Sequence, residues 1–363
     1  MKMLLPFYDD SSLFFVSKMK WELEKENLEC STLFVGNGRK FDRISDRQME
    51  AIFPKGPDFV ADTSELAMDF VCRFDAVIVC KITDELRLLF NNESFIGQDA
   101  RPCFIAFQPG LEFTPEKGIR HRQAFDAVFL NSKEDFLTYG SAFPQKRWRY
   151  VSWGHPYFIK PDSLKEDTGG PIYFFAQAIS PSTRNARVHI AEVMKAIALA
   201  NPQRQIVIKL RNLPSENANH LHKEKYSYPE LFTELSAMPP NLSFSACAMK
   251  DALQDASIVI TCTSTAAMDA ISAGLPTMVY TDYVENYLDS MASAMTKIFS
   301  SSGLITPLKR VLHLEYSRPQ ANWLNGHFRD RSLFREIKKI TSAFKDREAS
   351  KPSDKIENYL HEL

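Results

Sequence analysis

The sequence predicts an α/β protein built from two parallel sheets with helices on both faces. Short β-branched and apolar runs alternate with amphipathic segments, at intervals of roughly 25 residues in the first half. At 363 residues, the chain is long enough for two domains of ordinary size, each with its own core. Residues 157–168 are polar, contain Pro and Gly and have no periodicity, which predicts a linker. Because strands alternate with helices on both sides of this linker, we expect two parallel sheets.

Each strand expected in the first half is a short apolar run bounded by polar or turn-forming residues. We expect these strands at residues 3–8, 31–35, 59–61, 76–80, 103–107, 127–130 and 148–153. Helices are expected over 41–52, 64–72, 83–90 and 132–139, and in the amphipathic segment that carries Phe14, Phe15, Met19 and Leu23. The sequence contains no GxGxxG, so the glycine fingerprint of dinucleotide sites is missing.

The second half repeats this alternation. Strands are expected at residues 171–177, 205–210, 242–244, 258–260 and 277–280. Helices are expected over 188–200, 249–256, 266–273, 283–299 and 330–344, with an irregular stretch over 312–323. The expected organisation is therefore a first domain over 1–156, the linker over 157–168, a second domain over 169–328, and a C-terminal helix with a frayed tail over 329–363.

Composition excludes several classes of protein. Hydrophobic residues make up 44% and charged residues 25%, as in soluble globular proteins. A net charge of −1 gives no support for nucleic-acid binding. The six cysteines show no CxxC spacing and look like free thiols of a reducing compartment. Neither a signal peptide nor a membrane span is apparent, so we expect a cytoplasmic protein, with peripheral contact to the inner face of the membrane left open.

A hydroxyl-rich turn joins the strand over 258–260 to the next helix. Thr263, Ser264 and Thr265 stand together at the expected helix start, where backbone N–H groups and the helix dipole favour an anion. The same residues are also good helix caps, so a purely structural role stays open. An anion site is favoured because the turn follows the carboxyl end of a parallel strand, where open α/β sheets bind ligands.

Two cations end a neighbouring strand. Lys209 and Arg211 follow the QIVIKL run, and at that edge of a sheet they would suit a phosphate leaving group. An ion pair with Glu216 is the structural alternative. The sequence His220-Leu221-His222 invites a zinc interpretation, but a third ligand at suitable spacing is missing, so no metal site is predicted.

Several stretches resemble known glycosyltransferases. The turn followed by AAMDAISAGLPTMVY resembles the C-terminal half of GT-B glycosyltransferases, where this turn holds the nucleotide-sugar phosphate. DDSSLFFVSKMKWELEK, RPCFIAFQPGLEF and RHRQAFDAVFLNSKEDF are similar to a little-characterised bacterial glycosyltransferase family of the capsule or surface-polysaccharide type. The resemblance covers most of residues 5–280. It implies two Rossmann-like domains that face a cleft, with the terminal helix packed back on the first domain.

The resemblance also implies a set of donor contacts. Gln177, Ser180, Lys209, Arg211 and the 263–265 turn would bind the nucleotide and its phosphate, and Glu216 and His220 would contact ribose and base. The basic strand end paired with Ser264 and Thr265 is similar to transferases that use CMP-activated nonulosonic acids. The sequence departs from related donor domains in one respect, because Arg211 stands where they often carry a His-Pro element.

Acceptor chemistry is expected in the first domain. Asp10 or Asp9, at the carboxyl end of the first strand, would deprotonate the acceptor hydroxyl, although Asp10 could instead cap the following helix. Glu112, after the Pro109-Gly110 turn, is the rival base. Gly110 and His155 are expected near the hinge and the cleft, and for His155 a place at the hinge is favoured over contact with a ligand.

The sequence thus predicts a metal-independent, cofactor-free, inverting glycosyltransferase that moves a sugar to a cell-surface or lipid-linked glycan. A CMP-activated sialic-type acid is the favoured donor. The alternatives are a UDP-sugar transferase or 2-epimerase-like protein, a CDP-polyol phosphotransferase and, from another class, a non-catalytic GT-B-like binding or scaffold protein.

Overall fold

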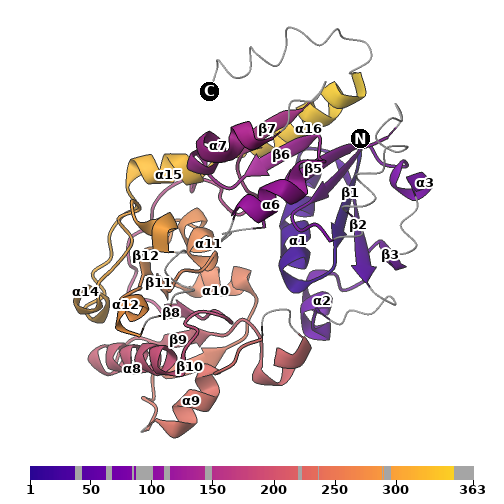
Figure 1. Ribbon diagram of the computed structural model, residues 1–363. Coiled ribbons are helices and arrows are strands. Elements are labelled where there is room, and N and C mark those ends of the chain that lie inside the picture. The colour runs from indigo at the N-terminus through magenta and orange to yellow at the C-terminus, as the bar shows by residue number, and fades with distance from the viewer. Residues whose placement is uncertain are drawn as a thin grey trace. The chain divides into compact units, whose positions relative to one another are not determined.

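The chain forms two compact units, which are described separately below. The computed structural model (Figure 1) describes residues 1–36, 43–62, 68–83, 86, 101–109, 115–143, 149–219, 223–235, 237–287, 289 and 296–346. Unit 1 comprises Met1–Pro156 with Arg329–Leu363, and unit 2 comprises Tyr157–Phe328.

Unit 1 is a parallel seven-stranded sheet with the strand order β3-β2-β1-β4-β5-β6-β7. Its strands are β1 (Lys2–Phe7), β2 (Glu29–Gly36), β3 (Phe59–Asp62), β4 (Ala76–Val79), β5 (Cys103–Phe107), β6 (Ala127–Leu130) and β7 (Tyr150–Trp153). Its described helices are α1 (Asp10–Lys25), α2 (Asp46–Ile52), α3 (Met68–Val71), α6 (Pro115–Arg122), α7 (Lys133–Tyr139), the short η3 (Gly140–Ala142) and α16 (Ser332–Lys345). The strand order reverses between β1 and β4, which makes their carboxyl ends the switch point of this sheet.

The start of α2 differs from the sequence prediction. The helix expected from residue 41 begins at Asp46, because the Ser45 side chain accepts a hydrogen bond from the Gln48 N–H and closes a capping box. The cap therefore sets the first residue of the helix, although the apolar pattern extends further towards the N-terminus.

Helix α16 packs on unit 1, beside β5, through a strongly amphipathic face that buries Phe334, Ile337 and Phe344. Glu336 on this helix pairs with Arg329 at 2.7 Å and accepts a hydrogen bond from the Tyr150 hydroxyl on β7. These contacts join the last described helix to the far end of the sheet.

Unit 2 is a parallel five-stranded sheet with the strand order β10-β9-β8-β11-β12. Its strands are β8 (Ile172–Phe175), β9 (Ile206–Lys209), β10 (Leu242–Ser245), β11 (Ile258–Thr261) and β12 (Thr277–Val279). Its described helices are α8 (Arg184–Ala200), the short η4 (Pro214–Asn219), α9 (Tyr228–Glu234), α10 (Met249–Asp255), α11 (Ala266–Ser272), α12 (Tyr283–Asn286), α14 (Leu308–Leu312) and α15 (Ala321–His327).

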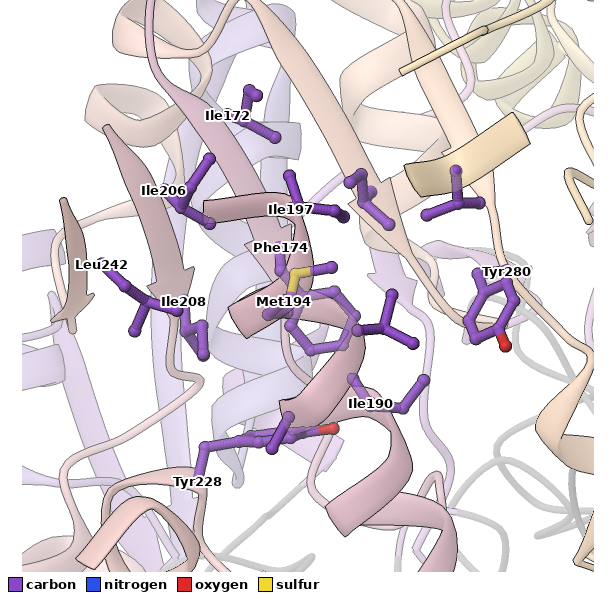
Figure 2. Close-up of a cluster of buried hydrophobic side chains, with 14 of the residues drawn as sticks. Ile172, Phe174, Ile190, Met194, Ile197, Ile206, Ile208, Tyr228, Leu242 and Tyr280 are labelled. Carbon is purple, nitrogen blue, oxygen red and sulfur yellow. The ribbon is translucent and has the colours of Figure 1, made fainter. Parts of the chain in front are cut away.

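The main core of unit 2 lies between α8 and the sheet. Apolar residues of α8 recur at helical spacing and meet the buried side chains of two central strands. Figure 2 shows these side chains: Ile190, Met194 and Ile197 from α8, Ile172 and Phe174 from β8, and Ile206 and Ile208 from β9. This packing fixes the helix that follows the first strand of the unit.

Two predicted boundaries in unit 2 are wrong. The helix expected over 283–299 is interrupted, because α12 ends at Asn286 and residues 296–299 are helical again. Between them, the Asp289 carboxylate accepts hydrogen bonds from the N–H and hydroxyl of Ser182 at 2.6 and 2.8 Å. The stretch expected to be irregular up to residue 323 becomes helical at Ala321, where α15 starts. None of the helices in the described part of the chain has the length and apolar character needed to cross a lipid bilayer.

Candidate functional site

Three loops meet at the carboxyl edge of the unit 2 sheet. The order of strands reverses between β8 and β11, so the carboxyl ends of β8, β9 and β11 surround the position where open α/β sheets bind ligands. The strand ends are level, because Phe175 pairs with Lys209 on one side and with Thr261 on the other. The loops that follow these strands carry the predicted Gln177 and Ser180, Lys209 and Arg211, and Thr263 to Thr265.

The hydroxyl-rich turn is held by its own polar groups. Thr261 donates its hydroxyl to the Phe175 carbonyl at 3.0 Å, and the Thr263 N–H donates to the side-chain oxygen of Gln177 at 3.1 Å. The Ser264 hydroxyl accepts from the Ala266 N–H at 3.1 Å, whereas the Thr265 side chain makes no capping hydrogen bond. Ser264 and Thr265 are half-buried and Thr263 is buried. Thr263 is therefore a buried part of the turn, held by Gln177, whereas Ser264 and Thr265 lie nearer the surface.

The basic residues at the end of β9 lie at the same edge of the sheet, where β8 separates β9 from β11 and its turn. The Lys209 side chain is 7% exposed, and its ammonium donates to the Leu210 carbonyl at 3.2 Å. Arg211 is half-buried. Glu216, in η4, accepts a hydrogen bond from the Leu213 N–H at 3.0 Å. A buried lysine at the switch-point edge is a cation held in a medium of reduced dielectric, where its attraction for a phosphate is stronger than in water.

The loop after β8 is held by neighbouring side chains. The buried Ser180 hydroxyl shares a hydrogen bond of 2.9 Å with the Tyr283 hydroxyl, and Ser182 is bound by Asp289. Burial raises the pKa of the nearby Cys262 thiol to about 12, so this thiol stays protonated and unreactive at neutral pH. Ser180 thus anchors the loop after β8 to Tyr283 through a buried hydrogen bond.

Unit 1 has a second polar group at its own switch point. Asp9 is the N-cap of α1 and accepts from the N–H and hydroxyl of Ser12 at 2.9 and 2.7 Å, and Lys81 at the end of β4 forms an ion pair with its other oxygen. The interpretation of Asp10 as the cap is therefore wrong, because Ser12 at the third helical position completes a capping box with Asp9. Asp10 follows in the first turn, where its carboxylate accepts from the Ser11 N–H at 2.8 Å.

The capping contacts separate the two aspartates as candidate bases. The Asp9 carboxylate is engaged in holding the helix start, since one oxygen accepts from the N–H and hydroxyl of Ser12 and the other from Lys81. Both side chains are buried. We therefore favour Asp10, which does not cap the helix, as the candidate base.

A buried arginine and a buried histidine extend this polar group. Arg122 is 3% exposed and donates to the carbonyls of Phe107 and Cys80 at 3.0 and 3.3 Å, so it lies at the carboxyl ends of β5 and β4. His155 packs against the rings of Phe15 and Phe107, and burial lowers its pKa to about 3. Since His155 is neutral at physiological pH, it contributes packing and polar contacts without charge.

Three predicted site residues, Gly110, Glu112 and His220, lie outside the described residues. Within the described ranges, groups of three or more His, Cys, Asp or Glu side chains that could hold a metal ion do not occur. Two residues were missed by sequence reasoning. Lys81 follows the apolar run AVIVC at a strand's carboxyl end, a position that signals a site residue, whereas Arg187 lies inside a helical pattern that carries no such signal.

Comparison of the sequence with protein families finds a match, described as "Putative glycosyltransferase (DUF6716)", over residues 24–342. The chain belongs to this family. A search of curated protein sequences finds no significant match.

Solved structures with a similar fold come from several organisms. A "putative UDP-N-acetylglucosamine 2-epimerase" of Listeria monocytogenes has a TM-score of 0.60 at 12% identity and covers 98% of this chain and 99% of its own. The S. aureus MnaA–UDP co-structure has a TM-score of 0.57 at 12% identity, with coverages of 98% and 99%. The UDP-GlcNAc 2-epimerase of Methanocaldococcus jannaschii has a TM-score of 0.57 at 12% identity, with coverages of 94% and 100%. Identities this low show the fold alone, and the predicted class, two parallel-sheet α/β domains of the GT-B type, is confirmed.

Proposed function

We propose that the protein transfers a sugar from a nucleotide donor to a glycan acceptor, with inversion at the anomeric carbon. Membership of the glycosyltransferase family supports the reaction class. The observation that carries the site assignment is the level row of strand ends in unit 2, where Lys209 and the 263–265 turn flank Phe175 at the switch point. One structural neighbour, the S. aureus protein, is a co-structure with UDP, which supports a nucleotide ligand for this fold.

In this proposal unit 2 binds the donor. Lys209 and Arg211 neutralise the departing phosphate, and the hydroxyls of Ser264 and Thr265 donate hydrogen bonds to its oxygens. Because Lys209 and Arg211 supply the positive charge, the proposed reaction requires neither a metal ion nor a cofactor. Gln177 acts through the turn, because its side-chain oxygen fixes the Thr263 N–H.

Unit 1 supplies the base. Asp10 takes the proton of the acceptor hydroxyl as that oxygen forms a bond to the anomeric carbon and the bond from this carbon to the phosphate oxygen breaks. Asp9, paired with Lys81, sets the first turn of α1 on which Asp10 lies. We favour a CMP-activated nonulosonic acid as the donor and a cell-surface or lipid-linked glycan, met at the cytoplasmic face of the membrane, as the acceptor. UDP-sugar transfer, favoured by the UDP of the structural neighbour, is the second candidate.

Thermal melting with CMP, UDP, CDP and GDP tests the nucleotide site. A nucleotide present at 100 times its Kd stabilises the folded state by about 2.7 kcal/mol, which is roughly 5–11 °C for a unit of this size. A shift with CMP alone supports the favoured donor, and a shift with UDP or CDP alone replaces it. The variant Lys209→Ala should lose most of the shift, whereas Lys165→Ala, which removes an exposed lysine at the opposite edge of the sheet, should keep it.

Acceptor chemistry has a separate test. With the donor identified, Asp10→Asn should lower kcat by about 10²–10⁴-fold and leave nucleotide affinity unchanged. An unchanged kcat would refute the role of Asp10. If none of the nucleotides stabilises the protein, the enzyme assignment fails and a GT-B-like scaffold becomes the better description.

A further inference from the structure

Two segments at the carboxyl edge of unit 2 converge on one buried guanidinium. Arg187, near the start of α8, is 1% exposed, although it is among the largest polar side chains in the chain. It donates hydrogen bonds to four backbone carbonyls and one carboxylate: Gln177 at 2.8 Å, Ala178 at 2.5 Å, Pro181 at 2.8 Å, Tyr226 at 3.0 Å, and the side chain of Glu224.

These bonds use every donor that Arg187 has. A guanidinium carries five N–H groups in a rigid planar fork, and each of them has an acceptor here. The Tyr228 ring lies against the cation, 5.5 Å from its central carbon. Because the fork is rigid and fully bonded, the loop after β8 and the segment before α9 are fixed relative to each other.

Hydrogen bonds lead from this guanidinium to the proposed ligand groups. The Gln177 carbonyl is held by Arg187, and the side chain of the same residue accepts from the Thr263 N–H. On the other side, the Asn217 side chain pairs with both the N–H and the carbonyl of Glu224, each at 2.7 Å. Asn217 lies in η4 next to Glu216, so Arg187 is connected to both the hydroxyl-rich turn and the loop that follows β9.

We propose that Arg187 is the positioning residue of the nucleotide site: it contacts no ligand itself and sets the relative placement of the three loops that do. This inference rests on the proposed function, because it assumes that the carboxyl edge of unit 2 binds a nucleotide. A lysine at this position keeps the charge but supplies three donors from a single point, so it cannot satisfy both segments at once.

The opposite edge of the same sheet provides a matched control. Arg204, just before β9, is also largely buried and binds both oxygens of Asp167 at 2.8 and 2.9 Å, the Gly170 carbonyl and the Ser257 hydroxyl. It therefore resembles Arg187 in chemistry and in the number of bonds, but it holds the amino ends of the strands, away from the proposed site.

The experiment compares Arg187→Lys with Arg204→Lys. The Kd of whichever of CMP, UDP, CDP and GDP binds the wild type is measured by titration calorimetry, at a temperature where urea unfolding shows all proteins folded. We expect Arg187→Lys to weaken binding by about tenfold or more, because loops displaced by a fraction of an ångström no longer match the ligand. Arg204→Lys should lose stability without a change in Kd.

A milder pair covers the case in which Arg187→Lys does not fold. Asn217→Ala removes the clamp on Glu224, and Asn241→Ala removes a comparable clamp at the amino edge, where the Asn241 amide donates to the carbonyls of Ala198, Asn201 and Arg204. Weaker binding in the Asn217 variant alone supports the proposal.

Equal effects of the carboxyl-edge and amino-edge variants on Kd would overturn it, since both would then act through general stability. A wild type that binds none of the four nucleotides would overturn the proposed function as well, and this outcome is seen before any variant is made.

Discussion

The approach of the linker to Gly274 gives the sharpest stability prediction. Gly274 ends the turn between α11 and β12 with φ of +75°, and a Cβ built on it would lie 2.3 Å from the backbone oxygen of Ser163. The Gly274 carbonyl in turn accepts a hydrogen bond of 2.7 Å from the Lys165 N–H. The variant Gly274→Ala therefore strains the backbone and also pushes the linker away from the turn.

The size of the effect follows from these two contributions. Placing an alanine in the left-handed region costs about 1–2 kcal/mol. The contact at 2.3 Å involves backbone on both sides, so the linker must move, and losing the Lys165 hydrogen bond costs about another 1 kcal/mol. The free energy of unfolding of unit 2 should therefore fall by about 2–3 kcal/mol.

Gly169 is a matched control in the same unit. Its φ is +76°, but a Cβ there would meet nothing within 4 Å, so Gly169→Ala should show the conformational cost alone. Urea unfolding followed by circular dichroism compares the two variants, and hydrogen exchange of the Lys165 amide reports the linker contact directly. If Gly274→Ala is no less stable than Gly169→Ala and the Lys165 amide stays protected, the close approach does not exist in solution.

Three further predictions concern unit 1. Burial lowers the pKa of His155 to about 3, so only the unfolded chain takes up this proton as the pH falls below about 6.5. The free energy of unfolding should therefore fall by about 1 kcal/mol between pH 6.5 and 5.5. His155→Gln should remove that part of the pH dependence in urea titrations, and an unchanged slope would contradict this prediction. A double-mutant cycle of Asp9→Asn and Lys81→Met should give a coupling energy of about 1–2 kcal/mol, because Asp9 is fully buried and asparagine can still cap α1. A coupling energy below about 0.5 kcal/mol would mean that water solvates the ion pair. Asp126→Asn should cost about 3 kcal/mol, because asparagine is neutral and has a single side-chain oxygen, so it cannot keep both hydrogen bonds that Arg101 donates to this largely buried group at 2.6 and 2.8 Å. A loss below about 1 kcal/mol would count against this reasoning.

Adjacent aspartates show where sequence reasoning reaches its limit locally. Either Asp9 or Asp10 could cap a helix by its chemistry, and Asp10 was the residue considered as the cap from the sequence. The choice depends on which residue has a hydroxyl three positions on to close the capping box, and on Lys81, which comes from a strand 72 residues away. Ser12 could have been recognised from the sequence, because it lies three residues after Asp9. The contact with Lys81 could not, because only the tertiary structure brings that lysine to Asp9.

The sequence by itself determined the alternation of strands and helices, the two sheets and the polar residues at the strand ends, because hydrophobic periodicity and caps act over a few neighbouring residues. The tertiary structure alone decided which of those strand ends meet. Strand β8 lies between β9 and β11, so Gln177 reaches the Thr263 N–H across 86 residues of sequence, and Arg187 joins the residues after β8 to Glu224. A buried guanidinium inside a helix has no local signature, since its role is defined by the distant carbonyls that it satisfies.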